Sequence, residues 1–316
     1  MKILMVTNMY PTEDRPGWGV FVMHQVKQLR RLGHNVDVMN IHGYRSKLNY
    51  IKAVFEVFQK TVRNRYDIVH AHYGYSGFPA LFRWRTPLVV TLHGSDALFG
   101  IFQPFISKCV SRLADAVIVV SKQIASVIPG DVIPCGVDLE VFKPRNRAEA
   151  RAYLGLPEKR RIIMFPFDPR KKIKRYDLAR AAIDRLASNG HDIELLVVTG
   201  VKNDLMPFYY NAADAMIICS DSEGSPTTVK EALACNIPVI CTNVGDLDEL
   251  ARKIPGIYIC NKDEEALARK IDYVLRNENN VNFDGYSAMG PYEHEHLAMS
   301  IISVYERVLK KGNRIM

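Results

Sequence analysis

The chain of 316 residues is longer than a single hydrophobic core usually serves, which predicts two domains. With 48% hydrophobic and 24% charged residues it has the composition of an ordinary globular protein, and no apolar run approaches the roughly 18 to 20 residues of a membrane-spanning helix. Six cysteines without a C-x-x-C pair argue against a zinc site and predict buried free thiols in a cytoplasmic protein. The opening MKILMVTNMYP is broken by Asn8 and Pro11, so it does not predict a signal peptide.

The first part of the chain predicts a parallel sheet. An apolar run, ILMVTN, is followed by a loop ending at Gly19, by a helical pattern over Val20–Leu32 that stops at Gly33, and by a second apolar run, NVDVMNI. Strand, loop, helix and strand in this order form a βαβ unit. The runs DIVHAHY, PLVVTLHG and AVIVVS continue the series, so we expect a first α/β domain over residues 1–138.

A second series follows a linker rich in Pro, Gly and charge, PCGVDLEVFKPRNRAEARAYLGLPEKRR. It contains the runs RIIMFPF, DIELLVVTG, AMIICS and IPVICTN, with helices expected over Arg175–Ala187 and Phe208–Ala213. These elements predict a second doubly wound α/β domain over residues 139–290. A last amphipathic helix, about His296–Lys310, follows a Gly-Pro break and makes 291–316 a separate segment. Two such sheets joined by a linker predict a cleft at their strand ends, where open α/β sheets bind ligands.

The stretch SEGSPTTVKEALACN predicts an anion-binding helix start. Ser225 is a natural N-cap and Pro226 a natural first helical residue, so the helix should run to about Cys235, with Asn236 in the left-handed conformation beyond it. A helix start presents unpaired N–H groups and positive dipole, which bind phosphate, and Gly224 permits close approach to the backbone.

Two glutamates flank this turn, although a glutamate repels phosphate. Glu223 is therefore explained by a ligand that also offers hydroxyl donors, such as a sugar. Glu231 lies about 7 to 8 Å up the helix from Pro226, a distance comparable to the span from a diphosphate to a ribose. The alternative is that Glu223 only complements the helix dipole and Glu231 is a solvated surface residue.

The DLD sequence at Asp246–Asp248 superficially matches a metal-binding motif. Asp246 would make a good N-cap with Glu249 as its capping-box partner, so we expect capping and no metal site. The sequence contains no G-x-G-x-x-G after the first strand and no Walker P-loop, which argues against a dehydrogenase or an NTPase.

Basic residues concentrate between Lys27 and Arg65, where nine of them face only Asp37 and Glu56. Such a segment can attract an anionic membrane or a phosphorylated acceptor, or it can keep the protein soluble. Nucleic acid is not expected as a partner, because no zinc-finger spacing or aromatic RNP pattern accompanies the charge.

The pattern EGSPTTVKEA resembles the E-x7-E element of retaining GT-B glycosyltransferases, specifically glycosyltransferase family 4. Other segments are similar to the family in the same order: KILMVTNMYP with Gly19, LGHNV, DIVHAHYG, VVTLHGSD and the interdomain IPCGVDLEVFKP. The resemblance covers nearly the whole chain. It implies a GT-B fold, with two facing Rossmann-like domains separated by a cleft and a final helix that packs back on the first domain.

The resemblance also implies roles for individual residues. Glu223 would contact the donor sugar near the reacting carbon, and Glu231 would bind the ribose hydroxyls. His93 of HGSD would lie near the donor sugar. The residues expected to hold the diphosphate are Gly19 and the turn formed by Gly224, Ser225, Pro226 and Thr227.

Positive charge for the leaving diphosphate would come from DPRKKIKRYDLA. Lys174 aligns with the family's phosphate-binding lysine, whereas Pro169 stands where the family usually has an arginine. Arg170 is the nearest substitute, and Lys171 is expected to be solvated.

The other histidines are less informative. His24, His70 and His72 could be structural or functional. His294 and His296, in the segment YEHEH, are expected at the surface.

The sequence thus predicts a metal-independent, retaining glycosyltransferase that needs no cofactor beyond its nucleotide diphosphate sugar. The second domain would bind the donor, and the first would bind a glycan or lipid-linked acceptor in polysaccharide or glycoconjugate synthesis. We expect it in the cytoplasm, and the Lys27–Arg65 segment leaves open a peripheral position on the inner face of the membrane. Two alternatives stay open: a sugar-nucleotide epimerase of similar fold, and a nucleotide-sugar-binding protein without activity, for which the Pro169 departure leaves room.

Overall fold

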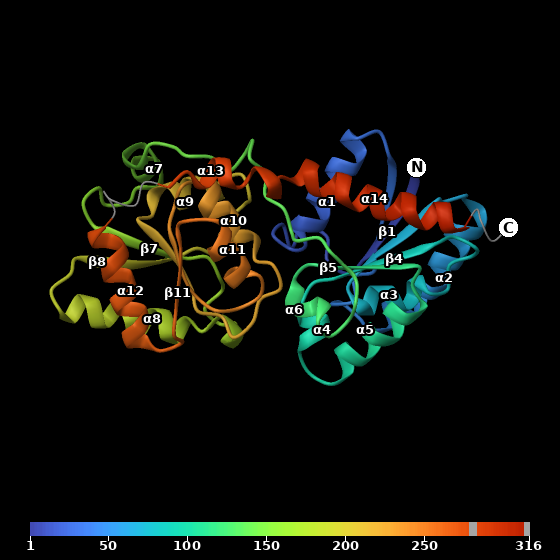
Figure 1. Cartoon of the computed structure of the whole chain (residues 1–316), viewed down its shortest axis with the longest axis horizontal. Coiled ribbons are helices and arrows are strands. Elements are labelled where there is room, and N and C mark those ends of the chain that lie inside the picture. Colours follow the sequence, from blue (N-terminus) through green and yellow to red (C-terminus); the bar gives the residue numbers. More distant parts are fainter. Residues whose placement is uncertain (278–282, 313–316) are drawn as a thin grey trace. The chain divides into compact units, whose positions relative to one another are not determined.

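The computed structural model describes residues 1–277 and 283–312, and packing divides the chain into two compact units (Figure 1). The first unit consists of Met1–Cys135 together with the segment from His294 onward, and the second of Gly136–Glu293. The unit boundaries thus follow Cys135 and Glu293, whereas we expected domain ends at 138 and 290. The expected segments also include residues 278–282 and 313–316, which lie outside the described residues.

The first unit is built on a six-stranded parallel sheet with the strand order β2-β1-β3-β4-β5-β6. Its strands are β1 (Lys2–Thr7), β2 (Asn35–Asn40), β3 (Ile68–His72), β4 (Leu88–Leu92), β5 (Ala116–Val119) and β6 (Asp131–Val132). Its helices are α1 (Val20–Arg31), α2 (Leu48–Arg63), α3 (Gly74–Ala80), α4 (Ser95–Leu98), α5 (Phe102–Leu113), α6 (Lys122–Ala125) and the C-terminal α14 (His294–Gly312).

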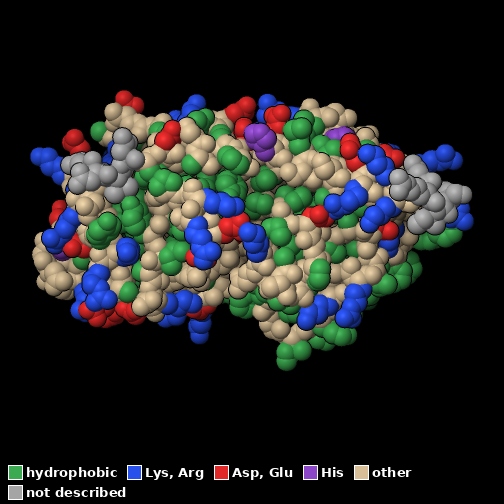
Figure 2. Space-filling model, viewed as in Figure 1, with side chains coloured by type: hydrophobic (Ala, Val, Ile, Leu, Met, Phe, Trp, Pro, Cys, Tyr) green, Lys and Arg blue, Asp and Glu red, His purple; other side chains and the backbone are tan. Residues whose placement is uncertain are grey.

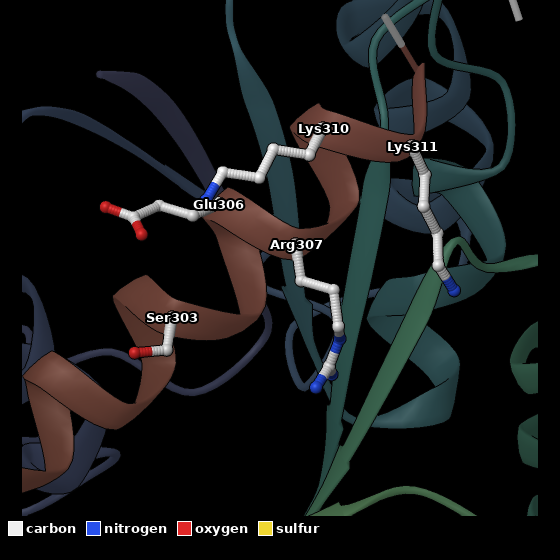
Figure 3. A pocket seen from close by; sticks show the side chains of 5 residues that line it. All are labelled: Ser303, Glu306, Arg307, Lys310 and Lys311. Atoms are coloured by element: carbon white, nitrogen blue, oxygen red, sulfur yellow. The ribbon is translucent and has the colours of Figure 1, made fainter. Parts of the chain in front are cut away.

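Helix α14 belongs to the first unit although it comes last in the sequence. It lies along α1 (Figure 1), and its residues Ala298, Ile301 and Tyr305 join the core on the side of the sheet that α1 covers. A shallow hollow on the outer side of α14 is lined by Ser303, Glu306, Arg307, Lys310 and Lys311 (Figure 3). Arg307 is tied there to Asp131 by an ion pair.

The second unit repeats the same plan with five parallel strands in the order β11-β10-β9-β7-β8. Its strands are β7 (Arg161–Phe165), β8 (Ile193–Val197), β9 (Ala215–Ile218), β10 (Val239–Thr242) and β11 (Ile257–Cys260). Its α-helices are α7 (Arg147–Leu154), α8 (Tyr176–Ser188), α9 (Met206–Ala212), α10 (Thr227–Ala234), α11 (Leu247–Lys253), α12 (Glu264–Arg276) and α13 (Gly285–Ala288). Two short 3-10 turns, η1 (Lys172–Lys174) and η2 (Gly290–Tyr292), complete it.

Continuous apolar runs form the strands because helices cover both faces of each sheet. Val89 and Val90, adjacent on β4, are both fully buried and lie in separate core clusters on opposite faces of the first sheet. Ile217 and Ile218 on β9 are divided in the same way in the second unit. Both sheets are therefore doubly wound, as the sequence predicted.

Two further properties bear on the sequence predictions. All six cysteines are free thiols, and Cys219, Cys235 and Cys241 are buried. Among the described residues, no helix is both long enough and apolar enough to cross a membrane.

Candidate functional site

The second sheet reverses its winding between β7 and β9, which are neighbours in the sheet but not in the sequence. The chain leaves β7 toward one edge and β9 toward the other, so the loops that follow these two strands diverge at their carboxyl ends. Open α/β sheets bind ligands at this switch point. Lys174 lies in the loop after β7 and Glu223 in the loop after β9. Topology therefore brings together two residues that stand 49 positions apart.

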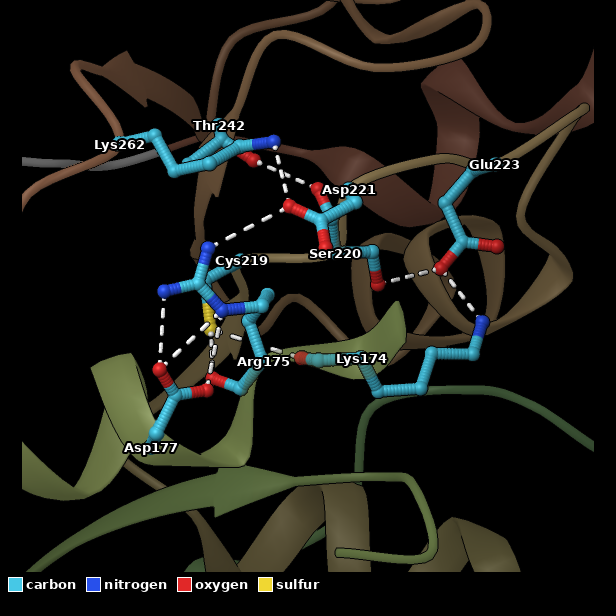
Figure 4. A network of polar contacts seen from close by, with 9 residues as sticks. All are labelled: Lys174, Arg175, Asp177, Cys219, Ser220, Asp221, Glu223, Thr242 and Lys262. Atoms are coloured by element: carbon cyan, nitrogen blue, oxygen red, sulfur yellow. Dashed lines mark hydrogen bonds and ion pairs between the residues drawn. The ribbon is translucent and has the colours of Figure 1, made fainter. Parts of the chain in front are cut away.

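Lys174 and Glu223 form a direct ion pair (Figure 4). The Lys174 Nζ donates to Glu223 Oε1 at 2.6 Å, and the Ser220 hydroxyl donates to the same oxygen at 2.7 Å. The ammonium also lies 4.0 Å from the centre of the Phe167 ring. The two charged side chains are only 17% and 12% exposed, so this pair is shielded from water more than an ordinary surface salt bridge.

A second set of charges fixes the loop that carries Lys174. Arg175, with φ of 52°, pairs with Asp177 at 2.8 Å and with Asp221 at 3.4 Å, and Lys262 pairs with Asp221 at 3.0 Å (Figure 4). The Asp221 N–H donates to the Ile173 carbonyl at 2.8 Å. The loops after β7 and β9 are thus joined by backbone and side chains, which holds Lys174 opposite Glu223.

The expected cap of α10 is wrong. The helix begins at Thr227, and Pro226 occupies the N-cap position with ψ of 114°. Ser225 stands one position before this N-cap, and its hydroxyl donates to Asp246 Oδ2 at 2.6 Å. Because Pro226 has no N–H, the turn can offer a phosphate only the amides around it. The other end of the helix is as predicted, since Asn236 has φ of 59°.

Asp246 also differs from its expected role. It stands at the N-cap position of α11, but its carboxylate makes no capping bond and faces Ser225 and the Lys230 ammonium at 3.2 Å. The capping box with Glu249 is therefore wrong. Among residues 1–277 and 283–312, no cluster of three His, Cys, Asp or Glu side chains has the geometry of a metal site.

Glu231 is half-buried on α10, one turn beyond Thr227. The Tyr210 hydroxyl of α9 donates to its Oε2 at 2.7 Å. Burial raises the pKa of the Glu231 carboxyl to about 7, against the lowering effect of the Tyr210 hydrogen bond and of the Lys230 charge. Glu231 is therefore not the freely solvated surface residue of the alternative interpretation.

Arg170 does not join the Lys174–Glu223 pair. Its side chain is 88% exposed, and its guanidinium pairs with Asp168 of the same loop at 2.8 Å. These hydrogen bonds lower the pKa of Asp168 to about 2. The arginine that the sequence put forward as a substitute is thus already neutralised by a neighbour.

In the first unit, Gly19 and His93 lie on loops that follow β1 and β4. Gly19 precedes α1 with φ of 73°, and a Cβ there would come within 2.2 Å of the Met9 carbonyl oxygen. Only glycine fits this close approach of the two backbones. The first sheet reverses its winding between β1 and β3, so the Gly19 loop is one of the two that flank the switch point.

His93 is held by a turn that the buried Asp96 carboxylate organises. Asp96 accepts hydrogen bonds from the backbone N–H groups of His93 and Gly94 at 3.0 Å and of Gly74 at 3.2 Å. The His93 Nε2 lies 2.9 Å from the Nδ1 of His72, which ends β3. Burial lowers the pKa of His93 well below its ordinary value, so the imidazole is neutral at physiological pH.

The histidine cluster extends beyond His93 and was not predicted. His70 stacks on His72 and contacts the Tyr305 hydroxyl of α14 at 2.5 Å and Thr91 Oγ1 at 2.7 Å. His70 and His72 stand two residues apart on β3, so their side chains point to the same face of the sheet. Only the pairing of β3 with β4 brings them to His93. An alternation of histidines in DIVHAHY is the one signal that could have indicated a shared face.

His294 is not at the surface as expected. It is buried, and its Nε2 lies 2.8 Å from the Nδ1 of His24 on α1. Burial lowers the pKa of His294 to about 3. His296, two residues later, is exposed as expected.

Comparison with known proteins agrees with this architecture. Residues 16–141 match Glycosyltransferase Family 4, and residues 195–290 match Glycosyl transferases group 1. TuaC of Bacillus subtilis, proposed by its name to be a teichuronic acid biosynthesis glycosyltransferase, is 30% identical over 86% of this chain and 88% of its own length. The D-inositol 3-phosphate glycosyltransferase of Mycobacterium marinum is 29% identical over 67% of this chain and 56% of its own length.

Solved structures are similar over nearly the whole chain. Sucrose-phosphate synthase from Thermosynechococcus elongatus has a TM-score of 0.79 at 20% identity and covers 98% of this chain and 99% of its own. HepE from Anabaena, solved in complex with UDP-glucose, has a TM-score of 0.73 at 16% identity, and the match covers 97% of this chain and 100% of HepE. The two family matches and the likeness to TuaC define a glycosyltransferase, and the likeness to solved structures shows that its fold is GT-B. The chain belongs to glycosyltransferase family 4.

Proposed function

We propose that this glycosyltransferase moves a sugar from a nucleoside diphosphate sugar to a glycan or lipid-linked acceptor, with retention of configuration and without a metal ion. The observation that carries the proposal is the shielded pair of Lys174 and Glu223 at the switch point, beside the start of α10. The solved HepE structures contain UDP and UDP-glucose, which supports a nucleotide sugar as donor. The name of TuaC supports a place in polysaccharide or glycoconjugate synthesis.

The diphosphate would take positive charge from Lys174 and from the amides at the start of α10. Without ligand, the Lys174 ammonium neutralises Glu223, so neither charge is left unpaired in this shielded position. A bound diphosphate shares the ammonium, and Glu223 turns its acceptor oxygens to the hydroxyls of the donor sugar. Gly19 would approach the diphosphate by its backbone. Arg170 would contribute less, because Asp168 holds its guanidinium.

The sugar would be transferred on one face of the ring. The acceptor hydroxyl attacks the anomeric carbon from the side on which the diphosphate departs, and its proton passes to the leaving phosphate oxygen. Lys174 stabilises the charge that develops as the bond between carbon and phosphate oxygen breaks. Neutral His93 can hydrogen-bond a sugar hydroxyl without adding positive charge beside the oxocarbenium-like carbon.

The test is an incubation of the purified protein with UDP-, GDP- and ADP-sugars, with and without membrane extract and glycan acceptors. We expect release of nucleoside diphosphate and a glycosylated product only when acceptor is present. Conversion of the donor to an epimer without acceptor would support the epimerase instead. Saturable donor binding with no product on any acceptor would support the binding protein without activity.

Glu231 gives donor binding a pH dependence. Ribose hydroxyls donate to a carboxylate, and the ligand-free carboxyl has a raised pKa of about 7, with Tyr210 and Lys230 as its polar neighbours. As pH falls below 7 the carboxyl is protonated, so donor affinity should fall by up to tenfold per pH unit.

The variant Glu231→Gln separates this effect from titration of the nucleotide itself. We expect its donor affinity to be about tenfold weaker than wild type at pH 8, with the ratio shrinking toward pH 6. Calorimetry of donor binding to both proteins at pH 8 and pH 6 gives the dissociation constants that check this ratio. A ratio that is the same at pH 6 and pH 8 would contradict a titrating Glu231 at the ribose.

The acceptor side is marked by a strongly apolar surface on the first unit. Helix α2 buries Ala53, Val57 and Thr61 against the sheet, yet exposes a second apolar row. That row consists of Leu48, Ile51, Phe55, Phe58 and Val62. At about 100° per residue the row forms a stripe nearly opposite the core face, and Lys52 and Arg63 lie on a third, mainly basic face together with the Glu56–Lys60 pair. A helix with separate core, apolar and basic faces fits the interface of an anionic membrane.

The same surface continues over α3, which packs against α2 and exposes Phe78, and over α5, which packs against α3 and exposes Phe105. Figure 2 shows hydrophobic side chains gathered at the edge of the first unit where Figure 1 places α4 and α5, with basic side chains beside them. Ile101 is 91% exposed and Phe102 72% exposed just before and at the start of α5. We therefore propose that a cytoplasmic enzyme attaches peripherally to the membrane through this surface. The Lys27–Arg65 segment contributes α2 to it, and α3 and α5 lie outside that segment.

Liposome co-sedimentation tests the attachment. The double variant Ile51→Ser/Phe55→Ser should reduce binding to vesicles containing phosphatidylglycerol by at least fivefold, because it removes two exposed apolar side chains that would enter the bilayer. Tyr273→Ser in the second unit, which replaces another exposed aromatic, should leave binding unchanged. Equal binding by wild type and the double variant would contradict a bilayer contact through α2.

A further inference from the structure

Lys230 is fully buried on α10, with an exposed fraction of 0%. Lysine is almost never fully buried unless its charge is paired, because taking an ammonium out of water is costly. Val229 and Leu233 on either side of it belong to the core, so Lys230 occupies a position that would ordinarily be apolar. In the site described above this charge only opposes the raised pKa of Glu231, and no step of the transfer chemistry uses it.

The ammonium is bound by two partners beneath the turn that opens α10. Its Nζ lies 2.7 Å from Ser225 Oγ and 3.2 Å from Asp246 Oδ2, and it lies 5.8 Å from the centre of the Tyr292 ring. The Ser225 hydroxyl donates to the same Asp246 oxygen at 2.6 Å. The hydroxyl thus donates to one buried charge and accepts from the other, so Ser225 can serve a phosphate only through its backbone.

The network joins the loop after β10 to the turn after β9. Gly245, with φ of 63°, lies so close that a Cβ there would stand 2.7 Å from the Gly224 carbonyl oxygen. Thr242 Oγ1 donates to the Ser220 carbonyl at 3.3 Å on the same side. Because the backbones touch at Gly224 and Gly245, a shift of the Asp246 loop would move the turn that offers its amides to the diphosphate.

We propose that Lys230 and Asp246 are positioning residues for the donor diphosphate, acting through Ser225 on the turn at Glu223–Pro226. The inference rests on the proposed function. Their charges cancel, so the turn keeps its attraction for an anion. Asp246 Oδ1 is buried, and within the described residues it has no hydrogen-bond partner. Without Lys230, this buried carboxylate would be uncompensated next to the place where a diphosphate must bind.

Three variants test the proposal. Ser225→Ala removes only the hydroxyl that links the charge pair to the turn. Lys230→Met leaves Asp246 uncompensated, and Lys230→Met/Asp246→Leu restores neutrality without restoring the link, because leucine has no oxygen to accept the Ser225 hydroxyl. Lys253→Met is the matched control, because Lys253 lies on the neighbouring α11 in an exposed pair with Glu249.

The readouts are the dissociation constants of UDP, GDP and ADP, measured well below the melting temperature, and the donor KM and kcat. We expect wild type and Lys253→Met to bind one of these nucleotides equally well. Ser225→Ala and the double variant should each bind it at least tenfold more weakly, and their donor KM should rise at least tenfold while kcat changes less than threefold. Lys230→Met should be weaker still. The double variant should regain thermal stability relative to Lys230→Met without regaining affinity, which separates positioning from support of the fold.

Folded Ser225→Ala and double variants that bind the nucleotide as tightly as wild type would overturn the inference. If Lys230→Met does not fold, Ser225→Ala and the double variant still test the inference. A wild-type protein that binds none of the three nucleotides would overturn the proposed function itself, and the inference with it.

Discussion

Replacing Glu223 with glutamine lowers kcat/KM for sugar transfer by at least a thousandfold, which is the largest effect we expect from a single substitution. The loss corresponds to about 4 kcal/mol of transition-state stabilisation, the scale of a preorganised charged contact to the reacting sugar. Glutamine keeps the shape of the side chain and the bond from Ser220, so the fold should be unaffected. Initial rates of product formation, with a thermal melt of the same sample, check the result.

A matched control for this substitution is Glu265→Gln. Glu265 pairs with Arg269 on the exposed side of α12 in the same unit, at 2.6 Å, the distance found between Glu223 and Lys174. It should retain wild-type rates because exposed pairs contribute little. Transfer by Glu223→Gln at more than a tenth of the wild-type rate would remove Glu223 from the reaction and return it to the role of a helix-dipole partner.

Replacing Lys174 with methionine should lower kcat/KM by a hundredfold to a thousandfold. The substitution removes the ammonium that faces the leaving diphosphate, and it also leaves Glu223 without its cation, so the diphosphate meets an uncompensated carboxylate. Both donor KM and kcat should worsen, because the charge acts on the bound donor and more strongly on the departing diphosphate. Donor titrations of the transfer rate separate the two parameters.

Lys171→Met is the control for Lys174. Lys171 lies in the same loop, just before the turn that carries Lys174, and is exposed. We expect its activity within twofold of wild type, since a solvated lysine is screened from the donor. An equal loss in the Lys171 and Lys174 variants would show a diffuse effect of the basic loop and contradict a specific phosphate contact by Lys174.

The fold could be predicted from the sequence because its determinants are local. Each strand is a short apolar run, and each covering helix carries a 3.6-residue pattern that ends at Gly33, Asn236 or a similar residue. Strands that alternate with helices along the chain favour a sheet in which the strands pair in parallel. The helix over Val20–Arg31 was therefore predicted to within one residue.

The candidate site could be predicted only where its residues share a motif. Glu223 and Glu231 follow from one continuous stretch, and Lys174 from its resemblance to the family. The histidine cluster could not be predicted, since His70, His72 and His93 meet only through the pairing of β3 with β4. Tyr210, whose hydroxyl holds Glu231, stands 21 residues earlier on a different helix.

The sequence by itself determined the two doubly wound units and the helix start that can bind an anion, because apolar periodicity and turn residues act over a few positions. Tertiary structure alone decided which charges meet. Ser225 and Asp246 are both residue types that commonly cap helices, and the sequence places each just before a helix. In the structure both side chains bind the buried Lys230 ammonium, and this contact contributes more to stability than a helix cap would. A solvated cap is replaceable by water, whereas a buried charge without its counter-charge is not.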